Sequence, residues 1–333
     1  MHLLCRADAG PHLGIGHAVR ALALAEAARE RGWQVTLAGD VAAPWLRREA
    51  ERLGGVGSVA GFLDADGLGH AVRGLDVDAV AVDHYGLPGD LRDAANAAGA
   101  VLLSVEDFTF GRRPADVVVN YHVGAEPDER PRDGSGVVLL GPAYAPVRAA
   151  VRTARQRRET SGALDADPPR ALVVMGGTDA TGVTSLVLDV LHRAGCLLDV
   201  TVVGGATAAP QGALRVRALP GGQPLPDLMA GNDLLVSAAG VSTYEACCIG
   251  LPAALLAVVP NQLPGYERLV ERGLVVGLGT PQHLRAAPDA VAAELRVFVR
   301  DPAGRRDMAL RAAQEVDGWG CARLLDAVAD VAG

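Results

Sequence analysis

Short apolar runs alternate with longer, alanine-rich amphipathic segments along the first half of the chain. Runs that are apolar on both faces are typical of strands in a parallel sheet, and the segments between them are typical of covering helices. In this half we predict strands at 3–5, 34–38, 79–83, 101–105, 116–120 and 137–140, and helices at 17–31, 45–52, 67–74 and 89–98.

The alternation stops at 151–169, where Arg, Thr, Ser, Gly, Asp and Pro crowd together, and then starts again. We therefore predict an N-terminal domain at 1–150, a linker at 151–169 and a C-terminal domain at 170–333. Both domains belong to the α/β class with doubly wound parallel sheets, which bind ligands at the carboxyl ends of their strands. In the second domain we predict strands at 171–175, 198–203, 234–237, 253–258 and 275–277, and helices at 182–194, 224–230, 243–250, 265–272, 288–299, 303–316 and 321–332.

The composition fits two compact cores and excludes several kinds of function. Half of the 333 residues are hydrophobic, which is enough for two domains. All 31 basic residues are Arg, so no Lys is present to form a Schiff base or to serve a P-loop. The net charge is −8 and only 152–158 forms an Arg cluster, so we expect no nucleic-acid partner.

Location and metal content follow from two further patterns. The sequence shows neither a signal-like leader nor an apolar run of membrane-spanning length. We therefore expect a cytoplasmic protein without an integral membrane segment. The five Cys residues lack CxxC spacing, which favours buried free thiols and implies no zinc site.

The loop at 6–20 is the most informative stretch, because it joins the first strand to the first helix. Gly14 and Gly16 let the backbone approach a ligand closely, and His17 follows at the start of the helix. The partial positive charge of a helix start favours a neutral imidazole, which can accept a proton. The alternative interpretation is a glycine-rich turn that carries a structural His.

Polar or glycine-rich residues follow three other predicted strands, at 83–86, 176–179 and 237–245. The first group is Asp-His-Tyr-Gly, which either serves a site or forms a turn capped by its Asp. The glycines of the second and the helix start of the third suit phosphate oxygens. Ser242 or Thr243 can cap that helix, and Glu245 can reach a ribose diol or act only as a charge near the helix end.

Taken together, these motifs resemble the UDP-sugar hydrolases of the pseudaminic acid pathway. Those enzymes belong to a wider group that includes spore-coat polysaccharide glycosyltransferases and, more distantly, the glucosaminyltransferase that makes lipid II. The resemblance spans nearly the whole chain and rests on Gly14-x-Gly16-His17-x-x-Arg20, Asp83-x-Tyr85, Gly141-Pro142-x-Tyr144, Gly176-Gly177-Thr178-Asp179, Ser237–Glu245, Asn261-Gln262 and Asp317-Gly318-x-Gly320.

The resemblance implies the glycosyltransferase-B (GT-B) fold, with the nucleotide diphosphate held mainly by the second domain and the sugar turned toward the first. It implies UDP-sugar as co-substrate with no metal and no other cofactor, because backbone N–H groups can stabilise the leaving diphosphate. It also implies a catalytic group of His17, Tyr85 and Asp83. The expected contacts to the nucleotide-sugar are Gly14, Gly16, Arg20, Gly176, Gly177, Thr178, Gly240, Ser242, Thr243, Glu245 as the ribose ligand, Asn261 and Gln262.

Two positions depart from the hydrolase pattern: Ala239 stands where Gly is usual, and Glu106 stands where Asp is usual. We therefore favour an inverting transfer from a UDP-sugar to a small acceptor, such as a sugar, a natural product or a nucleobase, with His17 as general base. Hydrolysis to free sugar and UDP is the alternative, and a non-catalytic UDP-sugar-binding protein is the third interpretation. Tyr85, Glu106 and Tyr121 are expected to line the acceptor pocket.

Overall fold

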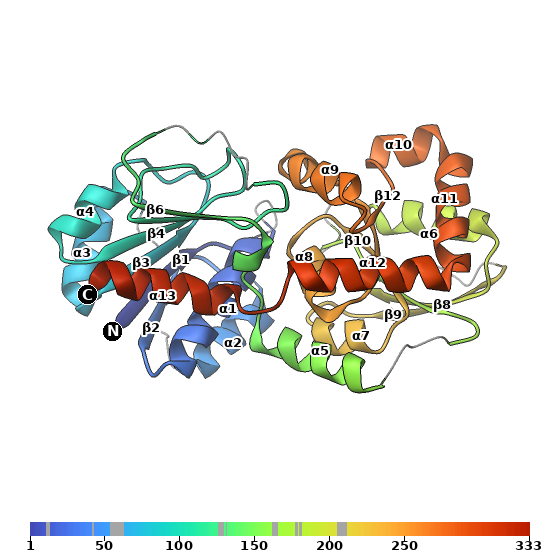
Figure 1. Cartoon of the computed structure of the whole chain (residues 1–333), viewed down its shortest axis with the longest axis horizontal. Helices are drawn as coiled ribbons and strands as arrows, with labels where there is room; N and C mark the ends of the chain where they lie inside the picture. Colours follow the sequence, from blue (N-terminus) through green and yellow to red (C-terminus); the bar gives the residue numbers. More distant parts are fainter. Residues whose placement is uncertain are drawn as a thin grey trace. The chain divides into compact units, whose positions relative to one another are not determined.

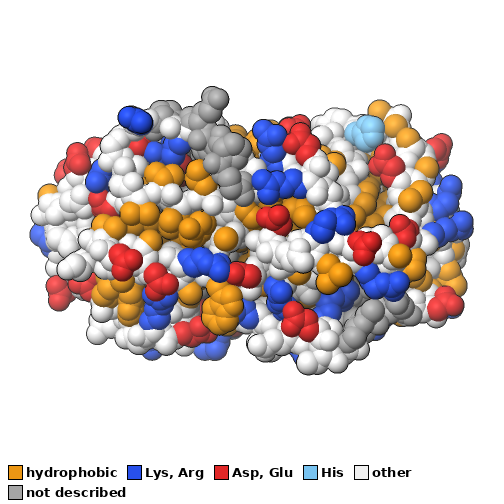
Figure 2. All heavy atoms as spheres, in the orientation of Figure 1, with side chains coloured by type: hydrophobic (Ala, Val, Ile, Leu, Met, Phe, Trp, Pro, Cys, Tyr) orange, Lys and Arg blue, Asp and Glu red, His pale blue; other side chains and the backbone are white. Residues whose placement is uncertain are grey.

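The chain folds into two compact units (Figure 1). Unit 1 comprises Met1–Ala149 together with Gly318–Gly333, and unit 2 comprises Ala150–Asp317. On the face shown in Figure 2, Arg and acidic side chains are interspersed rather than gathered into a stripe of one sign. Among the described residues, no helix is both long and apolar enough to cross a membrane. The computed structural model describes residues 1–10, 14–41, 43–53, 63–125, 130, 132–161, 166–176, 179, 182–204 and 212–333.

Unit 1 is built on a six-stranded parallel sheet with the order β2-β1-β3-β4-β5-β6. All residues of β3 and β5 are buried, as expected for strands that helices cover on both faces. The strands are β1 (His2–Ala7), β2 (Gln34–Ala38), β3 (Ala79–Asp83), β4 (Val101–Val105), β5 (Val117–Asn120) and β6 (Val137–Leu140). The α-helices of this unit that the structure describes are α1 (Gly16–Glu30), α2 (Pro44–Arg52), α3 (Ala65–Leu75), α4 (Leu91–Ala97) and α13 (Gly320–Ala332).

Side chains that alternate along the strands of unit 1 form its core. Leu68 of α3 and Leu91 of α4 pack with Val80 and Leu102 of the sheet in one buried cluster. Helix α13 contacts α1 and also β4 and β5. Helices α3, α4 and α13 thus pack against the sheet and hold its strands in place.

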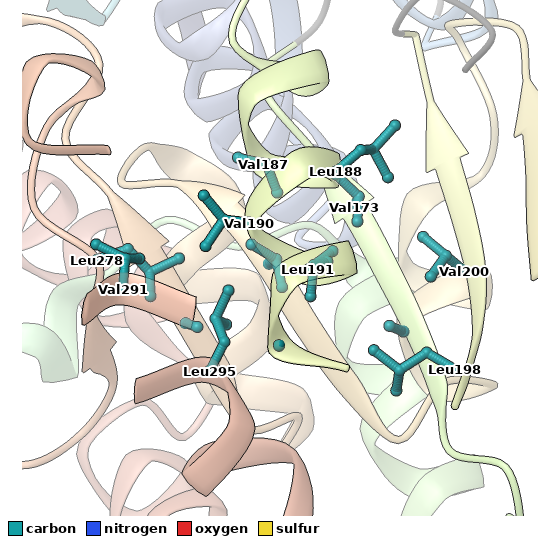
Figure 3. Close-up of a cluster of buried hydrophobic side chains, with 14 of the residues drawn as sticks. Val173, Val187, Leu188, Val190, Leu191, Leu198, Val200, Leu278, Val291 and Leu295 are labelled. Atoms are coloured by element: carbon teal, nitrogen blue, oxygen red, sulfur yellow. The ribbon is translucent and has the colours of Figure 1, made fainter. Parts of the chain in front are cut away.

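Unit 2 repeats this architecture with the strand order β12-β11-β10-β7-β8-β9. Figure 3 shows its core, where Val187 and Leu191 of α6 lie among Val173 of β7 and Leu295 of α11. The strands are β7 (Arg170–Val174), β8 (Leu198–Val203), β9 (Leu214–Leu219), β10 (Leu234–Ala238), β11 (Ala253–Leu256) and β12 (Val276–Gly277). The helices are α5 (Ala149–Ser161), α6 (Thr184–Ala194), α7 (Leu225–Ala230), α8 (Val241–Ile249), α9 (Leu263–Glu271), α10 (Pro281–Ala286), α11 (Pro288–Arg300) and α12 (Pro302–Glu315).

The predicted alternation of strands and helices is present in both units, but the domain limits differ from the predicted ones. Most of the predicted linker at 151–169 is helix α5, whose Val151 and Ala154 are buried. Residues 318–333 belong to unit 1 rather than to the predicted second domain. The reason lies in packing, because α13 begins so close to the 3₁₀ helix at Pro142–Tyr144 that a Cβ on Gly320 would lie 2.3 Å from the carbonyl oxygen of Ala145.

Candidate active site

His17 and Asp83 form a buried pair at the carboxyl edge of the unit 1 sheet. Asp83 is the last residue of β3, and Ala7 at the end of β1 is its partner in the neighbouring strand. Helix α1 begins beside them and carries His17 as its second residue. The His17 Nδ1 atom lies 2.6 Å from Asp83 Oδ1, and each residue is less than 10% exposed. The two predicted catalytic residues therefore meet through a short hydrogen bond.

Arg20, one turn further along α1, holds the same carboxylate with two bonds. Its Nε donates to Asp83 Oδ2 at 2.6 Å and its Nη2 donates to Oδ1 at 2.7 Å. Burial opposes the charge of Asp83, but attraction to Arg20 and His17 outweighs burial and holds the pKa of Asp83 below its ordinary value. The third nitrogen, Nη1, donates to the Tyr121 hydroxyl at 2.9 Å.

The guanidinium of Arg20 is therefore engaged within the protein, and the side chain is only 6% exposed. This placement differs from the predicted role of Arg20 as a direct contact to the nucleotide-sugar. Its position one turn after His17 in α1 brings it to the carboxylate that His17 also uses. Arg20 thus helps to fix the position of the Asp83 carboxylate that contacts His17.

The ionised state of Asp83 determines what His17 can do. A carboxylate only accepts hydrogen bonds, so Nδ1 of His17 carries the proton that it shares with Asp83. In a neutral imidazole with this tautomer, Nε2 keeps its lone pair and is the atom that can accept a proton. The aromatic ring of Tyr85 stands edge-on to the imidazole, with 4.5 Å between the ring centroids. A carboxylate bound to Nδ1 in this way favours the tautomer in which Nε2 has no proton.

His84 faces a different carboxylate. Its Nε2 lies 3.2 Å from Asp8 Oδ2, and Asp8 is itself bound by Arg6. Burial and the charge of Arg6 lower the pKa of His84. Two neighbouring residues of the Asp-His-Tyr-Gly motif therefore have different partners: Asp83 contacts His17, and His84 contacts Asp8.

Asp107, which follows β4, is the centre of a second buried cluster. The Tyr85 hydroxyl donates to its Oδ2, and His122 Nε2 lies 2.8 Å from its Oδ1. Arg20 Nη2 is 3.5 Å from the same carboxylate. Burial would raise the pKa of Asp107, but Arg20, His122 and Tyr85 together hold it far below its ordinary value. The positive charge of Arg20 therefore faces two carboxylates, Asp83 and Asp107. Asp107 in turn holds the ring of Tyr85 through its hydroxyl.

His122 was not among the residues predicted from the sequence, although one signal was present. It follows β5 directly after Asn120 and Tyr121, so it is another polar side chain at a strand end. The strand ends of β3, β4 and β5 are adjacent in the sheet, which brings His122 to Asp107. A search for polar residues after every predicted strand would have found it.

The three residues predicted to line the acceptor pocket differ in exposure. Glu106 is fully buried, and Arg130 binds it through Nη2 at 2.8 Å and Nε at 3.2 Å. Tyr121 is 2% exposed, and its hydroxyl accepts a hydrogen bond from Arg20. Both side chains therefore stabilise the fold of the site, and only the half-buried Tyr85 of the three is accessible to an acceptor.

In unit 2 the predicted nucleotide-binding loops follow two neighbouring strands. β7 and β10 pair in register through Val174 and Ser237, so Gly176 and Gly240 follow strand ends at one edge. Gly176 has a positive φ of 85°, which glycine adopts without strain. Gly177 and Thr178 lie outside the described residues.

Helix α8 starts earlier than predicted, and this changes the roles of its first residues. The N-cap is Gly240 in an extended conformation, and no side chain caps the helix. The predicted cap by Ser242 or Thr243 is therefore wrong, because the helix already contains both. The first turn carries no acidic residue, so Glu245 lies in the second turn, where it is 6% exposed.

Gln262 lies beside the start of α8. Its Oε1 accepts from the backbone N–H of Val258 at 2.9 Å, and its Nε2 is 3.7 Å from where a Cβ of Gly240 would be. Asn261 precedes it in the 3₁₀ helix at Pro260–Gln262. Among the described residues, no group of three or more His, Cys, Asp or Glu side chains is placed to hold a metal ion.

Comparison with known proteins gives relatives over most of the chain. No protein-family model matches. The spore coat polysaccharide biosynthesis protein SpsG of Bacillus subtilis is 26% identical over 297 residues, which is 84% of each chain. The UDP-N-acetylglucosamine–N-acetylmuramyl-(pentapeptide) pyrophosphoryl-undecaprenol N-acetylglucosamine transferase of Clavibacter michiganensis is 30% identical over 253 residues, 67% of each chain.

Solved structures of similar fold cover nearly the whole chain. MurG of Acinetobacter baumannii superposes with a TM-score of 0.70 at 18% identity, covering 99% of each chain. The glycosyltransferase SsfS6 of a Streptomyces species, solved with thymidine diphosphate, gives a TM-score of 0.58 at 16% identity and covers 98% of this chain and 99% of its own. Both units are thus represented in single structures of known glycosyltransferases.

Proposed function

Because the chain belongs to the glycosyltransferases of the GT-B fold, we propose that it transfers a sugar from a UDP-sugar to a small acceptor with inversion at the anomeric carbon. The observation that carries this proposal is the buried pair of His17 and Asp83, which are joined through Nδ1 at 2.6 Å; we assign Nε2 of the imidazole as the proton acceptor. A chain that only binds nucleotide-sugars has no need of an oriented base. The pair therefore favours catalysis over binding alone.

The reaction breaks one bond to the anomeric carbon and forms another. Nε2 of His17 takes the proton of an acceptor hydroxyl or N–H, and the acceptor atom attacks the anomeric carbon from the face opposite the diphosphate. The bond from that carbon to the diphosphate oxygen breaks, and UDP leaves with the electron pair. Asp83 stays ionised because Arg20 donates to it and lowers its pKa, and the carboxylate stabilises the imidazolium that forms.

Unit 2 supplies the proposed donor site. The start of α8 offers backbone N–H groups that we assign to the diphosphate, so the proposal requires no metal. We assign Glu245 to the ribose diol and Asn261 and Gln262 to the nucleotide or the sugar. The Clavibacter relative is named for UDP-N-acetylglucosamine, whereas SsfS6 was solved with thymidine diphosphate, so both nucleotides enter the test.

The test separates donor cleavage from transfer. The protein is incubated with a panel of UDP- and dTDP-sugars, each with and without ring and acyclic hydroxyl acceptors, and nucleoside diphosphate release is measured. Transfer predicts UDP release that needs an acceptor, together with a new glycoside detected by mass spectrometry. Release that is equal without acceptor means that water is the acceptor and the chain is a hydrolase. Tight binding without release in any combination means a non-catalytic protein.

A matched pair of variants tests the base in the same assay. His17→Asn should lower turnover by about 10²–10⁴-fold, with UDP binding unchanged within about twofold. His70→Asn is the control, because His70 is exposed on α3 of the same unit. Turnover of His17→Asn within about threefold of the His70 variant would exclude His17 as the base.

A further inference from the structure

Aromatic residues are rare in this chain but gather beside the proposed base. The sequence has only four Phe and five Tyr. Four of these nine residues lie next to the ends of β3, β4 and β5, namely Tyr85, Phe108, Phe110 and Tyr121. Tyr121 is buried, whereas the rings of Tyr85, Phe108 and Phe110 are partly exposed. Partly exposed rings that cluster in this way form a candidate surface for binding a ligand.

The turn Asp107–Phe110 separates two of these rings. Backbone N–H and carbonyl groups of Asp107 and Phe110 bond to each other in both directions at 3.0 Å. Between them Phe108 has a positive φ of 55°, a conformation that is unfavourable for a bulky side chain. Phe108 stacks on His122 with 5.0 Å between centroids, while Phe110 packs on Tyr85 at 5.6 Å. Strain of this kind persists where the surrounding contacts require it, and it is frequent at binding sites.

Phe110 and Tyr85 extend the site outward from His17. Phe110 is 37% exposed, Tyr85 is half-buried and His17 is 6% exposed. The Tyr85 ring is held at its outer end, because its hydroxyl donates to Asp107, and it lies so close to Gly111 that a Cβ there would be 3.3 Å from its Cδ1. We call Phe110 and Tyr85 the aromatic platform. It is a fixed apolar surface whose inner end touches the general base.

We infer that the aromatic platform binds the acceptor and that the acceptor is a ring compound with an apolar face, whose hydroxyl is directed at His17. This inference rests on the proposed function and adds the class of acceptor to it. Flat faces of pyranose or aromatic rings pack well on Phe and Tyr, and a ring bound here shields the neighbouring imidazole of His17 from water. The charged groups behind the platform are satisfied within the protein, since Asp107 binds Tyr85, His122 and Arg20. Apolar contact with the platform is therefore what selects the acceptor.

The experiment compares Phe110→Ala with two controls. Phe110→Tyr keeps the ring, and Val138→Ala removes an apolar side chain of similar exposure, 40%, from the edge strand β6 of the same unit. KM for acceptor and donor is measured with methyl β-glucopyranoside, p-nitrophenol and glycerol, using a nucleotide-sugar that the wild-type protein cleaves. Donor cleavage without acceptor is the reference. The glucoside and the phenol separate the two sources of a flat ring, and glycerol has hydroxyl groups but no ring.

Phe110→Ala should raise KM for a ring acceptor about 10-fold, with KM for the donor, for glycerol and the acceptor-independent rate unchanged within about twofold. Phe110→Tyr and Val138→Ala should match the wild type. The inference is overturned if KM for ring acceptors is unchanged, or if KM for glycerol or for the donor rises equally. In that case the proposed function still holds, provided that release of the nucleoside diphosphate depends on an acceptor. Release that no acceptor increases overturns both the platform and transfer. A chain that cleaves no donor contradicts the proposed function itself.

Discussion

Replacing Asp83 by Asn tests the catalytic arrangement more sharply than any other single change. The carboxylate accepts three short bonds, from His17 Nδ1 at 2.6 Å and from Arg20 Nε and Nη2 at 2.6 and 2.7 Å. Asn has nearly the same shape, but it is neutral and its amide N–H₂ is a donor. If that amide group faces His17, the imidazole proton moves to Nε2 and the lone pair needed by the acceptor is lost. We expect kcat to fall about 10²–10⁴-fold, with UDP binding unchanged within about twofold.

The same substitution should weaken the fold of unit 1. Removing one partner of a buried ion pair costs about 3–5 kcal/mol of unfolding free energy. We expect the lower end, about 3 kcal/mol, because Asn keeps one acceptor and Arg20 keeps Asp107 at 3.5 Å. For a domain of this size that loss lowers the unfolding temperature by about 6–12 °C. All three Trp residues lie in unit 1, so Trp fluorescence follows this unit.

Asp116→Asn is the matched control, because Asp116 is a buried carboxylate at the opposite edge of the same sheet. It binds Arg92 Nε at 2.7 Å and the backbone N–H of Leu102 at 2.8 Å, next to the start of β5. This variant should lose similar stability but keep wild-type turnover per folded molecule. Equal losses of turnover in the two variants, or wild-type turnover in Asp83→Asn, would refute the reasoning.

Three other predictions concern acid stability, nucleotide recognition and metal. The pKa values of Asp83 and Asp107 are below their ordinary value, so the stability that both contribute is fully present above about pH 4 and is lost as pH falls through their folded pKa values; the urea midpoint by Trp fluorescence should fall below that pH, and less steeply in Asp83→Asn. Glu245→Ala should weaken UDP binding by about 10–100-fold, and 2′-deoxy-UDP, which binds the unmutated protein poorly, should lose little more on mutation; additive losses in calorimetric titrations would show that Glu245 does not bind the ribose. Turnover should persist in EDTA, and a strict requirement for Mg²⁺ would contradict the proposed role of backbone N–H groups at α8.

Local patterns in the sequence were sufficient to predict most of the fold. Most strands are short segments rich in buried apolar residues, and the strands at 79–83 and 198–203 were predicted with their observed limits. β9 was missed because it alternates Leu214 and Val216 with Arg215 and Arg217, which is the pattern of an edge strand with one polar face. Helix α10 was missed as well, since it is a short segment begun by Pro281.

Long-range contacts account for what the sequence alone did not predict in the site. Placing His17, Asp83 and Tyr85 at strand and helix ends was sufficient to predict that they lie close together. The sequence did not reveal that Arg20 pairs with Asp83 and that Glu106 pairs with Arg130, because such pairings depend on how side chains pack across strands. The start of α8 at Val241 was missed for a similar reason, since Gly240 acts as the N-cap through its backbone conformation.

The return of α13 to unit 1 also determines the order in which the two units can be completed during synthesis. Unit 2 is one uninterrupted stretch, Ala150–Asp317, whereas unit 1 needs residues from both ends of the chain. A ribosome therefore releases every residue of unit 2 before it supplies α13, and until then the surface of α1, β4 and β5 that α13 covers has no partner from that helix. The unit that begins the sequence is in this way the last to become whole, and it is the unit that carries His17.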